Sequence, residues 1–212
     1  MGNGNREYMR KVTTTIEVYK FDELSEESQI KAVEAVQNDE SYLSYDWWDS
    51  CYECFKDRHG HLFDIDRIYF SGFWSQGDGA MFEYSFLYEE AWLDLFLDNQ
   101  KDMSDTRKAM IKRYCCISGK GTHRGHYYHE NCCSHSVYIE ADVDSCHTNI
   151  IDYVSEDLQE DFEDFFEDYY KEICGELYRT LEKDYEYLTS REAIEEHLID
   201  NDAEFEKDGT RY

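Results

Sequence analysis

The sequence contains no proline and few basic residues, and both shortages limit what the chain can be. Proline is absent from all 212 residues, so proline-rich linkers and stiff turns are excluded and one continuous unit is favoured. Lys and Arg together number 21, against 49 Asp and Glu, which gives a net charge of −28. A field of this sign repels nucleic acid and membrane surfaces and attracts basic partners.

Long apolar runs are missing as well. No stretch reaches the length that a membrane span needs, and no apolar segment follows the basic residues near the N-terminus, so we expect no secretory signal. The eight cysteines are then expected to be reduced thiols in a cytoplasm. Aromatic residues make up 17% of the chain, which is enough for a packed core.

The chain is organised around residues 64–88, which have the pattern of a β-hairpin. Ile68 and Phe70 alternate on the first arm, and Trp74 continues their phase, while Ala80, Phe82, Tyr84, Phe86 and Tyr88 alternate on the second. Alternation places such residues on one face of a sheet. Residues 76–79, Gln-Gly-Asp-Gly, have turn chemistry. They lack the Gly-Lys-Ser/Thr of a phosphate-binding loop and the acid ladder of a calcium loop.

The remaining pattern predicts a single α+β domain over residues 1–212. We expect an antiparallel sheet around the hairpin with helices covering one face. Helices are expected at residues 25–38, 42–56, 89–97, 104–114, 149–188 and 191–201. Further strands are expected at residues 12–21 and 137–141, the latter in the same sheet, with Tyr127 on its neighbour.

The predicted helix over residues 149–188 is long, acidic and amphipathic. Its apolar positions step by three and four, which predicts a buried stripe. They are Ile150, Val154, Leu158, Phe162, Phe165, Tyr169, Ile173, Leu177 and Leu181. Eight acids and no base lie between positions 156 and 168, namely Glu156, Asp157, Glu160, Asp161, Glu163, Asp164, Glu167 and Asp168. Such a face either imitates a nucleic-acid backbone or only keeps the protein soluble.

Thiol and imidazole side chains crowd the region from Cys115 to His135. The candidate ligands of a zinc ion there are His123, His126, His129, Cys132 and Cys133, because thiolate and imidazole groups suit tetrahedral zinc. The spacing fits no standard finger, so packed thiols and polar surface histidines are the alternative, as they are for Cys51-x-x-Cys54. No cofactor is otherwise expected.

Residues 101–130 carry a small excess of bases together with tyrosines. Basic residues among aromatics can bind single-stranded nucleic acid, but the acidic segments on both sides oppose this. We expect the basic helix at residues 104–114 to pair with the acidic helix. No nucleophile elbow, HExxH or paired-acid motif appears, which argues against an enzyme.

Five segments resemble a family of small uncharacterised proteins encoded by tailed phages and prophages, some of which are labelled antitoxin-like. They are YKFDELSEES (19–28), YDWWD (45–49), IDRIYFSGFWSQGDGA (65–80), RGHYYHE (124–130) and LEKDYEYLTS (181–190). The resemblance implies a phage protein in the host bacterial cytoplasm and supplies no catalytic residues. Phages often encode small acidic inhibitors of host defence.

These observations together predict an acidic binding protein that acts stoichiometrically on a basic host protein. The partner would be a nucleic-acid-binding defence enzyme, such as a CRISPR or restriction effector, or a toxin. The eight acids are the expected partner-binding residues, with Trp74, Gln76 and Asp78 at the hairpin turn. The alternative is a zinc-stabilised structural or RNA-binding module that uses the region from Cys115 to His135.

Overall fold

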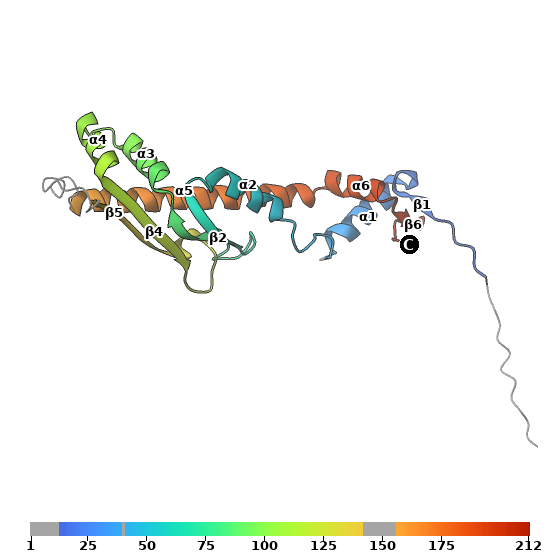
Figure 1. The fold of residues 1–212 in the computed structure, drawn as a ribbon. Coiled ribbons are helices and arrows are strands. Elements are labelled where there is room, and N and C mark those ends of the chain that lie inside the picture. The colour runs from blue at the N-terminus through green and yellow to red at the C-terminus, as the bar shows by residue number, and fades with distance from the viewer. Residues whose placement is uncertain (1–12, 40, 142–155) are drawn as a thin grey trace, which may run out of the picture. The chain divides into compact units, whose positions relative to one another are not determined.

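The computed structural model describes residues 13–39, 41–141 and 156–212, and within them the chain has the predicted α+β fold (Figure 1). The described residues form two compact units, one made of those up to residue 44 together with 186–212 and the other of those between 45 and 185. The expectation of one domain over residues 1–212 stays a prediction. No described helix is long and apolar enough to cross a membrane.

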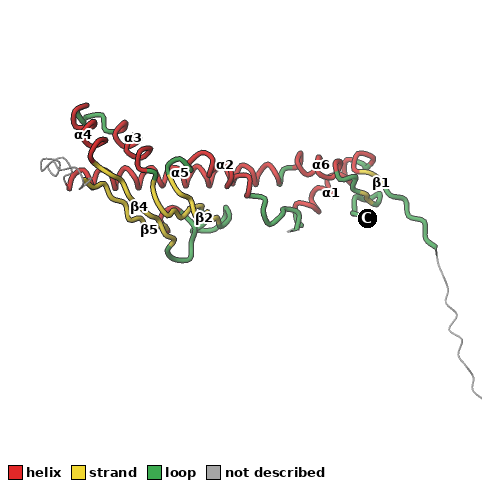
Figure 2. The backbone as a smooth tube through the Cα atoms, in the orientation of Figure 1, coloured by secondary structure: helices red, strands yellow, loops and turns green. Residues whose placement is uncertain are grey.

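The larger unit contains a four-stranded antiparallel sheet in the order β2-β3-β4-β5 (Figure 2). Its strands are β2 (Phe63–Phe70), β3 (Ala80–Leu87), β4 (Cys115–His123) and β5 (Cys133–Ala141). The predicted hairpin is therefore confirmed as β2 and β3, and the strand predicted at residues 137–141 is the second half of β5. Tyr127 was wrongly placed on the neighbour of β5. That neighbour is β4, and Tyr127 lies in the loop after it.

Helices of this unit bury one face of the sheet. They are α2 (Asp49–His59), α3 (Glu89–Asn99), α4 (Asp105–Tyr114) and α5 (Glu156–Leu188). Phe55 of α2 packs on Phe82, and Trp92 of α3 packs on Phe63, with ring centroids 5.3 and 5.1 Å apart. The helix predicted at residues 42–56 starts later than expected, because residues 42–48 form turns and bends before α2.

Two compensating β-bulges interrupt the hairpin register. Phe63 lies opposite Leu87 while Ile65 lies opposite Tyr84, so β3 has one extra residue between Tyr84 and Leu87. The next register step places the extra residue in β2, between Ile65 and Arg67. The predicted alternation therefore fails after Tyr84. Leu87 is buried, whereas Phe86 and Tyr88 are 46% and 42% exposed.

Helix α5 packs on the sheet through a buried stripe. In the middle of the helix this stripe lies one residue later in the chain than predicted. Phe166 and Tyr170 are 0% and 1% exposed, while Phe165 and Tyr169 are half-buried beside Trp92 of α3. The other described stripe residues are buried as predicted: Leu158, Phe162, Ile173, Leu177 and Leu181. Residues 149–155, with Ile150 and Val154, lie outside the described part of the chain.

The smaller unit has its own apolar core. It contains β1 (Tyr19–Lys20), η1 (Phe21–Glu23), α1 (Glu26–Gln37), α6 (Arg191–Asp200) and β6 (Glu204–Phe205), and β1 pairs with β6. Ser25 caps α1 by accepting a hydrogen bond from Ser28 N, and Ser190 caps α6 in the same way, as expected. The strand predicted at residues 12–21 is wrong in length, because residues 13–18 have no regular structure and Ile16 is 48% exposed.

Candidate functional site

Helix α5 presents its acids to solvent on the side away from its buried stripe. Seven described side chains are exposed and are called the acidic face from here on: Asp157, Glu160, Asp161, Glu163, Asp164, Glu167 and Asp168. The eighth predicted acid, Glu156, begins the helix, and its side chain lies outside the described residues. At ~100° per residue, the seven form two adjacent rows. Asp157, Asp161, Asp164 and Asp168 form one row, Glu160, Glu163 and Glu167 form the other, and the two rows lie on either side of the direction opposite the buried stripe.

The acidic face is poorly neutralised by the rest of the protein. Lys171 Nζ is 2.9 Å from Glu167 Oε2, and this is the ion pair that the described structure gives to the face. Gln159 Nε2 also donates to Glu163 Oε1 at 2.6 Å. The sequence predicted that the basic helix α4 would pair with α5. Instead Lys112 of α4 pairs with Asp94 of α3, so among the described residues the face stays available to an outside partner.

The hairpin turn holds three predicted partner-binding residues in different roles. Asp78 Oδ2 accepts hydrogen bonds from the backbone N–H groups of Trp74 and Ser75, at 3.0 and 2.6 Å. That carboxylate therefore shapes the turn. Trp74 is 78% exposed and its ring packs edge-on against Phe73. Gln76 is exposed and lines a cleft.

The loop after β4 packs directly on this turn. Gly77, at φ +99°, faces the ring of Tyr127, and a Cβ added at Gly79 would lie 2.6 Å from the Cβ of His129. Only glycine permits these two close approaches. The turn and the loop enclose an open cleft of about 550 Å³, lined by Gln76, Gly77, Asp78, Tyr127, His129, Glu130 and Asn131. Two motifs far apart in the sequence thus form one surface.

The predicted metal ligands are divided between different structural roles. Cys132 Sγ lies 3.4 Å from His129 Nε2, and this is the hydrogen-bonded pair that the described structure gives among them. His123 Nε2 lies 3.0 Å from the carbonyl of Tyr127, and Cys133 Sγ donates to Phe82 O at 3.7 Å. His126 is exposed in the loop. No group of three His, Cys, Asp or Glu side chains is arranged to hold a metal in the described ranges, and zinc binding stays a prediction.

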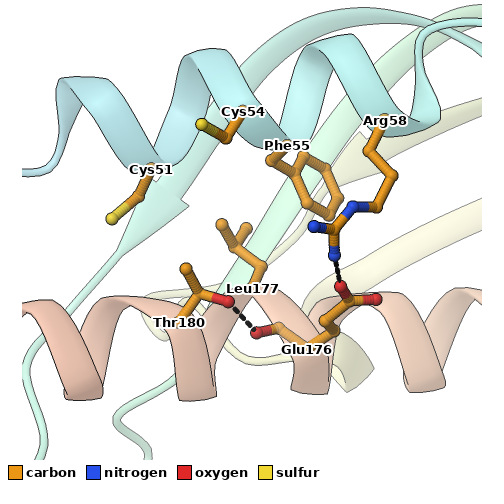
Figure 3. Close-up of a pocket in the computed structure, with 7 residues that line it drawn as sticks. All are labelled: Cys51, Cys54, Phe55, Arg58, Glu176, Leu177 and Thr180. Carbon is orange, nitrogen blue, oxygen red and sulfur yellow. Dashed lines mark hydrogen bonds and ion pairs between the residues drawn. The ribbon is translucent and has the colours of Figure 1, made fainter.

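A small pocket lies between α2 and α5 (Figure 3). Its lining residues are Cys51, Cys54, Phe55, Arg58, Glu176, Leu177 and Thr180, and its volume of about 30 Å³ admits little more than a water molecule. Arg58 forms an ion pair with Glu176 at its edge. Cys51 donates to Asp184 Oδ2 at 3.0 Å, and burial together with that carboxylate raises the pKa of the thiol to about 12. Cys51 is therefore a packed, protonated thiol.

A polar network inside the core was not found from the sequence. Tyr170 donates to the carbonyl of Phe82 at 2.7 Å and accepts from the Phe82 N–H at 3.2 Å. Tyr84 Oη and His135 Nδ1 are 3.1 Å apart. Burial lowers the pKa of His135 to about 4, so the ring is neutral near pH 7. The bonds between Tyr170 and Phe82 anchor α5 to β3, and the contact between Tyr84 and His135 joins β3 to β5. Sequence alternation marked Tyr84, but nothing marked its partner.

The comparisons with known proteins bear on the family and leave the activity open. A family model described as a domain of unknown function, DUF8835, matches residues 47–191. Because this range covers more than half of the chain, the protein belongs to that family. No curated protein and no solved structure matches the chain. The matched range contains the hairpin, the cleft beside its turn and the acidic face.

Proposed function

We propose that this DUF8835 member is a phage-encoded acidic binding protein that acts stoichiometrically on a basic host protein. The observation that carries the proposal is the acidic face itself. It has seven exposed carboxylates on one helix, and among the described residues one of them, Glu167, forms an intramolecular ion pair. The partner is a nucleic-acid-binding defence enzyme or a toxin in the host cytoplasm, as the resemblance to tailed-phage proteins implies.

The spacing of the charges supports a partner that normally binds nucleic acid. Residues 157–168 span about 17 Å at 1.5 Å per residue, so the seven charges lie about 2.4 Å apart along the axis. Duplex DNA carries one charge per about 1.7 Å. A groove built for phosphates therefore meets a similar line of negative charge on α5.

The rigidity of the face also supports binding. Its helix is fixed to the sheet by buried rings and by the two hydrogen bonds between Tyr170 and Phe82. Preformed charges lose less conformational entropy on association than charges on a loose segment. Like charges three and four residues apart destabilise an isolated helix, so the buried stripe has to hold the acids in place.

The test compares two charge reversals of equal size. The first replaces Asp157, Glu160, Asp161, Glu163 and Asp164 by Lys. The control replaces five exposed acids outside the face, Glu34, Glu186, Glu196, Asp200 and Glu206. Tagged proteins are used to capture partners from bacterial lysate at low and high salt, and each captured partner is then purified and its affinity measured.

We expect the wild type and the control to bind the same basic protein at low salt and release it at high salt. The face variant should lose at least tenfold in affinity while its far-UV circular dichroism and melting temperature are retained. Duplex DNA should compete for the same site. Equal binding by the face variant and the control would disprove the proposal.

A further inference from the structure

The face of the sheet opposite the helices carries a groove that the acidic face does not use. It has a volume of about 380 Å³ and is lined by Ser85, Phe86, Leu87, Ile117, Ser118, Gly119, Lys120, Ser136 and Tyr138. This volume lies within the range of small-molecule sites. The groove runs over β3, β4 and β5, all of which belong to the larger unit.

Two aromatic rings are exposed in this groove. Phe86 is 46% and Tyr138 is 48% exposed. Phe86 is there because of the bulge in β3. Without the extra residue it would lie on the same face as Tyr84 and would be buried. Bulges often re-aim a side chain next to a functional site, and this one moves an aromatic ring out of the core into a groove.

The floor and the polar groups of the groove suit a flat ligand. Gly119 and the small side chains of Ser118 and Ser136 lie between the bulkier residues. In the described structure the paired residues of β3 and β4 are Tyr84 and Gly121. Neither serine has a side-chain hydrogen bond within the described part of the chain, so both hydroxyls can bond the edge of a heterocyclic ring. Ser85 is already occupied, because it donates to Asp66 Oδ2 at 2.6 Å.

Lys120 gives the groove its charge. It is the one charged residue of the lining, its side chain is exposed, and no carboxylate of the described chain forms an ion pair with it. An exposed lysine without an ion-pair partner in the described part of the chain is complementary to an anionic group of a ligand. The Asp66 carboxylate, which accepts the hydrogen bond from Ser85, repels an anion at the Ser85 end of the groove. The anion therefore belongs at Lys120.

We propose that this groove binds a nucleotide, with the base stacked on the exposed rings of Tyr138 and Phe86 and the phosphate at Lys120. Stacking on aromatic rings tolerates any base, because each base has a π-face, so we expect little preference among the four bases. The site is distinct from the acidic face and does not depend on the function proposed for it.

The test measures binding of nucleoside monophosphates to the full chain by calorimetry. The matching nucleosides and inorganic phosphate serve as comparison ligands. We expect the nucleotides to bind more tightly than either part alone. Tyr138→Ala should weaken nucleotide and nucleoside alike by about tenfold, the scale of one lost stacking contact. Lys120→Met should reduce the affinity for the nucleotide to that for the nucleoside and leave nucleoside binding unchanged.

Tyr45→Ala is the matched control, because Tyr45 is 97% exposed and lies outside the groove. Its affinities should equal those of the wild type. Phe86→Ala provides a second groove variant if Tyr138→Ala lowers the melting temperature. Absence of nucleotide binding by the folded wild type would overturn the proposal. So would concentration-dependent dimerisation that Tyr138→Ala abolishes, because the groove would then belong to a second copy of the chain.

Discussion

The two faces of α5 use the same helix in opposite ways. One face buries Leu158, Phe162, Phe166 and Tyr170 against the sheet, and the other exposes seven carboxylates over nearly the same length. The buried face is specified by the shapes of the rings it meets. The acidic face makes few contacts of its own and is constrained only by where the buried face points.

The difference separates stability from recognition. Substitutions on the buried face should lower the free energy of unfolding, and any effect on binding should follow from unfolding. Substitutions on the acidic face should change binding and leave the fold intact. This division makes the proposal for the acidic face testable, because a loss of binding there cannot be explained by a damaged core.

The largest effect on stability is expected when the buried one of two neighbouring phenylalanines is replaced. Phe166→Ala should lower the free energy of unfolding by about 3–5 kcal/mol, because the ring is 0% exposed and leaves a cavity. Phe165→Ala should cost about 1–2 kcal/mol, because that ring is only half-buried beside α3. Urea denaturation of both variants measures the difference. Equal losses would mean that the buried stripe runs through both positions.

A second test uses pH on the buried side of the molecule. Burial lowers the pKa of His59 and of His135 to about 4, from an ordinary value near 6.5. The unfolded chain therefore binds more protons than the folded chain between these values. Stability is fully present above about pH 6.5 and is lost as the pH falls towards about 4. Denaturation at a series of pH values should show this slope.

The variant His59→Phe sharpens the pH test. Both ring nitrogens of His59 are buried without a hydrogen-bond partner in the described structure, and the ring packs 4.8 Å from that of Phe55. Phenylalanine keeps the ring and removes the unsatisfied atoms, so stability near pH 7 should rise by about 1 kcal/mol. The slope between pH 6.5 and 5 should become shallower. An unchanged slope would show that the pKa of His59 is not lowered in the folded protein.

Gln159 lies at the boundary between the two faces and should have an intermediate effect. Its Nε2 donates to Val137 O and its Oε1 accepts from Ile139 N, both at 2.9 Å, so its amide covers the free edge of β5. Gln159→Ala should cost about 1–2 kcal/mol, mainly for the two lost hydrogen bonds to β5, and the exposed hydrogen bond to Glu163 Oε1 is lost as well. Exchange of the Ile139 amide hydrogen should accelerate. Glu160→Ala, on the exposed neighbour, should leave the exchange of the Ile139 amide hydrogen unchanged and should not lower the free energy of unfolding.

Local signals in the sequence predicted much of the fold. Serine caps at Ser25, Ser104 and Ser190 gave three helix starts, because a side chain that satisfies its own helix needs no distant partner. The turn at residues 76–79 was found for the same reason. The shift from Phe165 to Phe166 was missed, because steps of three and of four both fit a helix and only the rings of the sheet and α3 decide between them.

The candidate sites were predicted unevenly for a related reason. Charge density is local, so the acidic face could be identified from the sequence alone. The groove depends on a bulge between Tyr84 and Leu87 and on β4, whose Gly119 and Lys120 fell in a region without a clear strand pattern. Nothing in Ser85 or Phe86 marks a bulge, because the extra residue is defined only by the register with β2.

The smallest effect is expected from a single charge on the acidic face. Asp164 has acids on both sides at helical spacing, Glu160 and Asp161 before it and Glu167 and Asp168 after it. Asp164→Lys should therefore raise the free energy of unfolding by about 0.5 kcal/mol, since repulsions become attractions. Asp164→Asn should give about half of that gain, because it only removes the repulsion. High salt should abolish both gains, and a loss of stability at low salt would contradict the independence of the two faces.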